Sequence, residues 1–244
     1  MDDANDIFTF DARQSDSPLV EFIWRTQSER PGAFMSSANS HWEMVVTKYQ
    51  GTASLTVRGP ETKASPAPIP ENAEFFGMVF KLGTFMPHLP ATNLVNGAIT
   101  LPEAAHQSFW LNCSTWQLPD FDNADTFIHR LVREGLLAHD SIVHAALNEH
   151  AQELSLRTVQ RRFLQATGMT YKTIQQIERA HAAMTLLQQG VPILDAVYET
   201  GYSDQSHLTN SLKRFMGKTP AQITQIRLSD AIYPASGINN AQTE

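Results

Sequence analysis

Apolar residues recur at helical spacing in two short segments of the C-terminal half of the chain. Val159 and Phe163 lie four residues apart, and Leu208 and Leu212 repeat this pair 49 residues later. A glycine and then a threonine follow each pair at matching distances. Because residues four apart share one face of a helix, each copy predicts an amphipathic helix with one buried face. Residues 171–189, between the copies, predict one continuous helix. The pattern therefore indicates two repeated helical units joined by a longer helix.

The polar face of the first copy carries side chains that suit the edges of DNA bases. We expect Ser155 to cap the helix, because its hydroxyl can accept hydrogen bonds from the free first-turn amides. Arg157, Gln160 and Arg161 lie opposite the apolar face. In a major groove, arginine can pair bidentately with guanine, and glutamine with adenine. A solvated charged face is the alternative interpretation of this copy taken alone.

The second copy contains a complete helix, turn and helix. Residues 193–200 and 204–216 have helical patterns, and Gly201 in the turn between them tolerates a positive φ. Ser203 is the expected N-cap of the second helix. This order is typical of a helix-turn-helix, whose second helix enters the major groove of DNA. The exposed face of the second helix carries Ser206, Asn210, Lys213 and Arg214, with His207 at its edge.

Three sequence blocks resemble a known family. The segments LSLRTVQRRFLQATGMT, IERAHAAMTLLQQG and ILDAVYETGYSDQSHLTNSLKRFMGKTPAQI are similar, in order and spacing, to the DNA-binding domain of the AraC/XylS family of bacterial transcription regulators. The resemblance covers residues 140–228 and implies two helix-turn-helix units that read successive major grooves of double-stranded DNA. The polar faces and the resemblance together assign DNA contacts to Arg157, Thr158, Gln160, Arg161, Gln205, Ser206, His207, Asn210, Lys213 and Arg214.

A few positions depart from the family pattern. Ala196 and Val197 reverse the usual order of a large and a small residue, so we expect a rearranged packing there. Leu212 replaces an aromatic residue in the second recognition helix, and Asn210 stands where many members have arginine. The last two changes bear on the affinity and base preference of the second unit, and not on its fold.

The N-terminal half has the pattern of a β-sheet protein. Short β-branched and aromatic runs such as VEFIWRT and EMVVTKY are separated by turn signals, and residues 50–52 predict a hairpin. Residues 60–70 contain four prolines and predict a long polar loop, while residues 1–18 are expected to be frayed. Several strands without intervening helices indicate an antiparallel sandwich or barrel. The resemblance implies a cupin-like half-barrel that serves in sensing or in dimerisation.

One amphipathic helix is predicted between the two halves. Residues 124–138 place Phe127, Ile128, Leu131 and Val132 on one apolar stripe. We expect this helix either to pack on the barrel or to pair with its copy in a second subunit. A short hinge is predicted to follow it, at residues 138–141.

The predicted fold class is therefore α+β. It comprises a cupin-like antiparallel half-barrel with a helix at residues 1–139, an all-α double helix-turn-helix domain at 140–228, and a disordered tail at 229–244. Strands that close on themselves often leave a cavity for one small ligand, and a fully packed interior is the alternative. We expect an apolar pocket for a small-molecule effector lined by Phe22, Trp24, Trp42, Phe76 and Phe80.

Charge is unevenly distributed along the chain. The formal net charge is −7, with −7 in residues 1–139, +2 in residues 140–228 and −2 in the tail. A weakly positive domain attached to an acidic one can bind DNA through local clusters of charge. The chain has no apolar run of about 18 residues, its acidic N-terminus does not resemble a secretory signal, and its single cysteine, Cys113, is interpreted as structural. We therefore expect a cytoplasmic protein that does not enter the membrane.

Two functions are compatible with this pattern. The favoured one is a sequence-specific DNA-binding transcription regulator, a homodimer whose N-terminal domain binds an effector or a second subunit, with RNA polymerase as a further partner. The alternative is a metal-dependent cupin-type enzyme with an appended DNA-binding domain. His41, Glu43, His88 and His106 are the available ligands, but their spacing is not that of a tight metal motif. We expect no metal, no cofactor and no catalytic residue.

Overall fold

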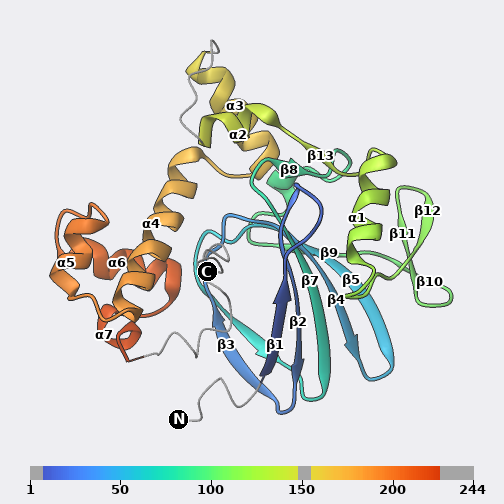
Figure 1. Ribbon diagram of the computed structural model, residues 1–244, viewed down its shortest axis with the longest axis horizontal. Helices are drawn as coiled ribbons and strands as arrows, with labels where there is room; N and C mark the ends of the chain where they lie inside the picture. The colour runs from blue at the N-terminus through green and yellow to red at the C-terminus, as the bar shows by residue number, and fades with distance from the viewer. Residues whose placement is uncertain (1–7, 148–154, 226–244) are drawn as a thin grey trace, which may run out of the picture.

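The computed structural model describes residues 8–147 and 155–225 and has an α+β architecture (Figure 1). The N-terminal half is rich in strands and the C-terminal part is helical, as the sequence predicted. In Figure 1 the main sheet and α1 (Ala124–Arg133) lie on one side of the molecule, and α4 to α7 lie on the other.

The main sheet contains six antiparallel strands. Their order is β1 (Phe8–Arg13), β2 (Val20–Ser28), β7 (Ala73–Phe80), β4 (Glu43–Tyr49), β5 (Thr52–Arg58) and β9 (Ala98–Thr100). Smaller sheets join β3 (Gly32–Ser36) to β6 (Ser65–Ile69), β8 (Thr84–Phe85) to β13 (Ala138–His139), and β10 (Glu103–Ala104) to β11 (Ser108–Leu111) and β12 (Ser114–Gln117). The cupin-like half-barrel stays a prediction.

The remaining elements are helical. They are the 3-10 helix η2 (Ala91–Asn93), α2 (Ser141–Leu147), α3 (Leu156–Thr167), α4 (Tyr171–Gln188), α5 (Ile193–Glu199), α6 (Gln205–Met216) and α7 (Pro220–Ile223). The long continuous helix that the sequence predicted at residues 171–189 is α4. The predicted helix-turn-helix of residues 193–216 is formed by α5 and α6.

The largest apolar cluster lies between the main sheet and α1. Inward-facing strand residues such as Ile23, Met44 and Phe80 meet Ile128 of α1, and all four side chains are fully buried. The helix therefore packs on the sheet, which was one of its two predicted uses. The predicted apolar stripe was wrong at Val132, whose side chain is 41% exposed.

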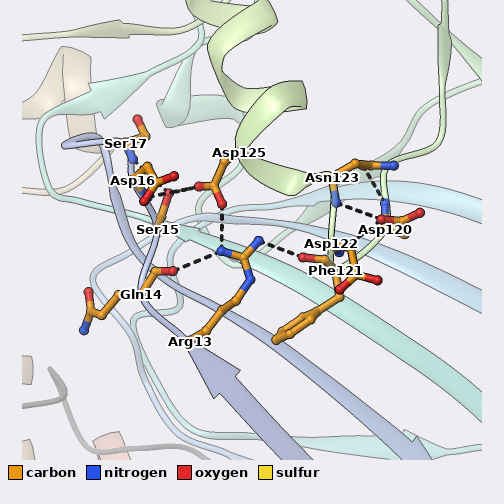
Figure 2. A network of polar contacts seen from close by, with 10 residues as sticks. All are labelled: Arg13, Gln14, Ser15, Asp16, Ser17, Asp120, Phe121, Asp122, Asn123 and Asp125. Carbon is orange, nitrogen blue, oxygen red and sulfur yellow. Dashed lines mark hydrogen bonds and ion pairs between the residues drawn. The ribbon is translucent and has the colours of Figure 1, made fainter.

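A hydrogen-bonded network fixes the end of β1 to the start of α1, as Figure 2 shows. The guanidinium of Arg13 donates to the Asp125 carboxylate over 2.7 Å and to the Phe121 carbonyl oxygen over 2.7 Å, and the Ser15 hydroxyl also donates to Asp125. Burial alone would raise the pKa of Asp125, but these hydrogen bonds and the Arg13 charge outweigh it and lower the pKa. The predicted fraying of residues 1–18 was therefore wrong for residues 8–17.

The turn of the hairpin predicted at residues 50–52 is confirmed. Tyr49 of β4 pairs with Thr52 of β5, and the two residues between them have positive φ values of 50° at Gln50 and 78° at Gly51. Two-residue hairpin loops favour this left-handed backbone because its twist matches the twist of the flanking strands. Glycine adopts it without steric cost, which explains its position in the turn.

Two predicted loops contain strands. Residues 60–70 include β6, whose prolines are tolerated because β6 pairs only with β3 and needs few backbone donors. Residues 138–141 include β13, which pairs with β8, so the predicted hinge is held on the N-terminal half.

Cys113 is exposed, with a φ of 61° in the turn before β12, and it is not part of a buried core. The predicted tail of residues 229–244 lies outside the described residues.

Candidate nucleic-acid interface

The two repeated units have equivalent helix ends. Ser155 accepts a hydrogen bond from the Thr158 amide at the start of α3, and Asp204, 49 residues later, accepts one from the His207 amide at the start of α6. Gly168 and Gly217 end these two helices in the left-handed conformation, with φ of 74° and 69°. The equivalent threonines, Thr170 and Thr219, then cap α4 and α7. The sequence repeat is therefore a repeat of helix caps.

One prediction about these caps was wrong. Ser203 does not cap α6, because its hydroxyl donates to the Asp204 carboxylate and also lies 3.1 Å from His207 Nδ1. Asp204 accepts the first-turn amide instead, and this hydrogen bond is the main cause of the lowered pKa of Asp204. The 49-residue offset from Ser155 could have identified Asp204 as the cap.

The repeated apolar positions form one helical core. Phe163 of α3 and Leu208 and Leu212 of α6 are fully buried, and they share a cluster with Ile174 and Ile177 of α4. The two residues whose order departs from the family pattern, Ala196 and Val197, are buried in the same cluster. Figure 1 shows α3 at the top of the picture and α6 at the left, with α4 running between them. At about 1.5 Å per residue, the 18 residues of α4 span roughly 27 Å.

The predicted DNA-contacting residues lie on the faces opposite this core. On α3, the side chains of Arg157, Gln160 and Arg161 are exposed, and Thr158 is half-buried, with its hydroxyl 3.0 Å from that of Ser155. All six predicted residues of α6 are exposed: Gln205, Ser206, His207, Asn210, Lys213 and Arg214. Each helix thus presents a separate polar face, and the DNA contacts of these residues stay a prediction.

The N-terminal half contacts the C-terminal end of α6. The backbone amide of Ala38 donates to the Phe215 carbonyl oxygen over 2.6 Å, and that of Ala64 donates to the Arg214 carbonyl oxygen over 2.9 Å. The last carbonyl groups of a helix have no partner within the helix, so these two amides supply one. Ala38 is fully buried in the helical core cluster, although it lies in the N-terminal half of the chain.

The N-terminal half contacts the end of α3 at the equivalent point. A Cβ atom at Gly168 would lie 2.7 Å from the Ala91 carbonyl oxygen of η2, and one at Gly217 would lie 2.4 Å from Cγ of Met35. Arg162 of α3 also pairs with Asp140 over 3.2 Å, and the backbone amide of Asp140 donates to the Gly83 carbonyl oxygen of the N-terminal half over 2.8 Å. Both α3 and α6 therefore end against the N-terminal half, which the sequence pattern did not predict.

Polar side chains complete the contact between the halves. The Ser40 hydroxyl donates to the Glu178 carboxylate of α4 over 2.5 Å, and His181 Nε2 donates to the Ala38 carbonyl oxygen over 2.7 Å. His41 is half-buried next to Ser40, with its Nδ1 3.4 Å from the Ser40 hydroxyl. Burial lowers the pKa of His41, and this effect is larger than the opposite effect of the Glu178 and Glu21 carboxylates. The nearby His181 lowers the pKa of His41 further. Neutral His41 is therefore the form that this contact favours.

The five aromatic residues predicted to line one effector pocket lie in two clusters. Trp42, Phe76 and Phe80 belong to the main core, where Trp42 stacks on Phe80 at 4.1 Å between ring centroids. Phe22 and Trp24 belong to a separate cluster. The register explains the division, because Phe22 and Trp24 pair with Val79 and Gly77 of β7. Positions 77 and 79 lie on the opposite face of the sheet from Phe76 and Phe80, since successive residues of a strand alternate between faces. These five residues therefore do not line a common pocket.

Two of the four residues considered as metal ligands, His41 and Glu43, have other contacts. His41 lies within hydrogen-bonding distance of Asn39, and Glu43 accepts a hydrogen bond from Trp24 Nε1 over 3.2 Å. Across residues 8–147 and 155–225, no group of three or more His, Cys, Asp and Glu side chains is placed to hold a metal ion. No helix within the same residues is both long enough and apolar enough to cross a membrane.

Comparison with known proteins concerns the helical part. Residues 150–226 match a protein family described as a helix-turn-helix domain. The chain is 33% identical over 85 residues to the HTH-type transcriptional regulator RipA of Corynebacterium glutamicum. These 85 residues cover 34% of this chain and 26% of that protein. It is 34% identical over 101 residues to the regulator of the same name from Corynebacterium diphtheriae, covering 41% of this chain and 30% of that protein.

The chain thus spans less than a third of the length of either relative. No solved structure matches it significantly. The matched residues nonetheless include α3 to α7 and both repeated units. The C-terminal part of this chain is therefore a helix-turn-helix domain of the AraC type, as the sequence resemblance predicted.

Proposed function

We propose that the chain is a sequence-specific DNA-binding transcription regulator whose two helix-turn-helix units read successive major grooves. The observation that carries this proposal is the structural repeat: α3 and α6 have equivalent caps, equivalent buried residues and separate exposed polar faces. A second helix of this kind is the element that enters the groove. The similarity to two regulators of transcription supports the same function.

Position along each helix suggests the role of each side chain. Arg161 of α3 and Asn210 of α6 are 49 residues apart, so they occupy equivalent exposed positions. Arginine suits guanine and asparagine suits adenine. Lys213 and Arg214 lie in the last turn of α6, and we assign them to phosphates of the DNA backbone.

The N-terminal half is proposed to act on DNA binding through the ends of the recognition helices. Its contacts at Gly168 and Gly217 support this role, because they fix the ends of α3 and α6 to one body. A change in that body would alter the spacing and the angle between the two helices. A small-molecule effector, a second copy of the chain and RNA polymerase are the partners that the family resemblance implies, and each stays a prediction.

Selection of bound duplexes from a random DNA library tests the proposal. The full-length protein should enrich a motif with two separate segments. A variant carrying both Arg161→Ala and Asn210→Ala should lose the enrichment and keep its melting temperature, because both side chains are exposed. Arg133→Ala removes an exposed cation of α1 and should retain the motif. A wild-type protein that enriched no sequence would refute sequence-specific binding.

A further inference from the structure

A hollow of about 460 Å³ is lined by residues of both α4 and α6, beside the core where the two helices pack together. Its lining comprises Lys172, Gln176 and Arg179 of α4, Tyr202 of the turn before α6, and His207, Asn210, Ser211, Arg214 and Phe215 of α6. Three of these side chains are cationic, Lys172, Arg179 and Arg214, and no carboxylate is among them. None of the three cations forms an ion pair with a residue that the structure describes.

The residues contributed by α4 form one stripe. Lys172, Gln176 and Arg179 are spaced four and three residues apart, so they project from the same face of the helix. The stripe begins at the first turn of α4 and runs along the side of α4 that faces α6. Neither the helix pattern nor the family resemblance had assigned these residues a role.

Aromatic contacts hold two of the three cations, Arg179 and Arg214, at the two walls of the hollow. The Arg179 guanidinium carbon lies 5.5 Å from the centroid of the Tyr202 ring, and that of Arg214 lies 4.9 Å from the centroid of the Phe215 ring. Tyr202 is itself fixed, because its hydroxyl lies 2.8 Å from that of Ser211. Cations held on aromatic faces lose less conformational entropy when they bind an anion, so the hollow is prepared for negative charge.

We propose that this hollow binds a phosphate group of the DNA backbone, which makes α4 a third DNA-contacting element beside α3 and α6. The inference rests on the proposed function and extends it. Asn210, which points at the groove in that proposal, also lines the hollow. A helix in a major groove has a sugar-phosphate backbone along each flank. The flank of α6 that faces α4 carries Arg214 and Ser211, and the α4 stripe lies opposite them.

The donors of the hollow match a phosphate diester. Lysine and arginine neutralise its charge, and arginine can bind two phosphate oxygens at once. Gln176 and Ser211 add neutral donors of the kind that also bind backbone phosphates. Such a contact carries no sequence information. It would set the register of α6 in its groove and strengthen binding to all duplexes alike.

The salt dependence of duplex binding tests the proposal in the full-length protein. Lys172→Gln and Arg179→Gln each remove one cation from the hollow. The logarithm of the affinity falls as the logarithm of the salt concentration rises. Losing one phosphate contact should make this negative slope less steep, by about 0.9. Lys48→Gln removes an exposed cation from the main sheet and should leave the slope unchanged. Arg179→Lys keeps the charge and should retain most of the slope.

The outcomes separate this inference from the proposed function. A wild-type protein that bound no duplex would overturn both. A wild-type protein that bound DNA, with the same slope in Lys172→Gln and Arg179→Gln, would overturn only the phosphate site. Lys172 is exposed, so its replacement cannot unfold the core and still tests the site if Arg179→Gln disturbs Tyr202.

A free anion is the other source of the same chemistry. Thermal stabilisation by inorganic phosphate, measured for the wild type and for Lys172→Gln, distinguishes the two sources. If Lys172→Gln removed stabilisation by inorganic phosphate but kept the DNA slope, the hollow would be a site for a free anion, and the proposal would be wrong. The proposal is supported if Lys172→Gln both makes the salt dependence of duplex binding less steep and weakens the thermal stabilisation by inorganic phosphate.

Discussion

Replacing Gly217 by alanine should destabilise the chain more than the same change at Gly201. Both glycines have a φ of +69°. An L-residue in this left-handed conformation costs about 1–2 kcal/mol at either position. The sites differ in their surroundings: a Cβ at Gly217 would lie 2.4 Å from Cγ of Met35, whereas one at Gly201 would have no heavy atom within 4 Å. Gly201→Ala is therefore a control for the backbone alone.

The difference between the two variants reports on the contact of α6 with β3. Overpacking costs about 1–3 kcal/mol, and we take the lower end because Met35 is flexible and its side chain is 39% exposed. Gly217→Ala should therefore lose about 1 kcal/mol more unfolding free energy than Gly201→Ala. Urea unfolding of the full-length variants, followed by far-ultraviolet circular dichroism, measures this difference if the m-values agree.

A double-mutant cycle tests the cause. Met35→Ala shortens the side chain that the new Cβ would meet, so Gly217→Ala should cost less in that background and approach the cost of Gly201→Ala. Equal losses for the two glycine variants in the wild-type background would refute the reasoning. An excess that survived Met35→Ala would place the strain elsewhere.

Two further predictions concern protonation. Because the pKa of Asp125 is lowered in the folded state, its carboxylate contributes stability that is present above its ordinary pKa of 3.8 and is lost as pH falls through the folded value. Asp125→Asn should therefore lose about 1–3 kcal/mol of unfolding free energy at neutral pH. Urea unfolding that showed no loss would contradict the role of the network in Figure 2. Because the pKa of His41 is lowered from its ordinary 6.5, stability should be complete above that value and fall as pH falls below it. The wild type should lose more unfolding free energy than His41→Gln between neutral pH and about pH 5.5, and equal losses would contradict the burial argument.

The sequence predicted the helical part well because its signals are local. The four-residue spacing within each apolar pair (Val159 and Phe163, Leu208 and Leu212) is a signal that spans only a few residues. The cap at Ser155 and the glycine after each helix are equally local. The error at Ser203 was also local: two adjacent residues can both cap a helix, and the geometry of the turn selects Asp204.

Long-range packing set the limit of prediction. Ala38 lies in a segment without a strong pattern, yet it is buried among residues of α3 to α7, and no local signal indicates that contact. The pairing of β6 with β3 likewise depends on a partner distant in sequence. The prediction that five aromatic residues line one pocket was wrong for the same reason. The division of Trp24 from Phe80 follows from the register of β2 on β7, which the alternation within one strand does not fix.

The measurement that tests the central claim most directly is the base preference of two single variants, Arg161→Ala and Asn210→Ala, in binding selections with the full-length protein. Each change should relax the preference at one position, and the two positions should lie in segments about one helical turn, roughly 10 base pairs, apart. Loss of Arg161 should cost about 1–3 kcal/mol of binding free energy at the preferred base. If both variants relaxed the same position, or if neither altered any preference, α3 and α6 would not each read a groove of their own.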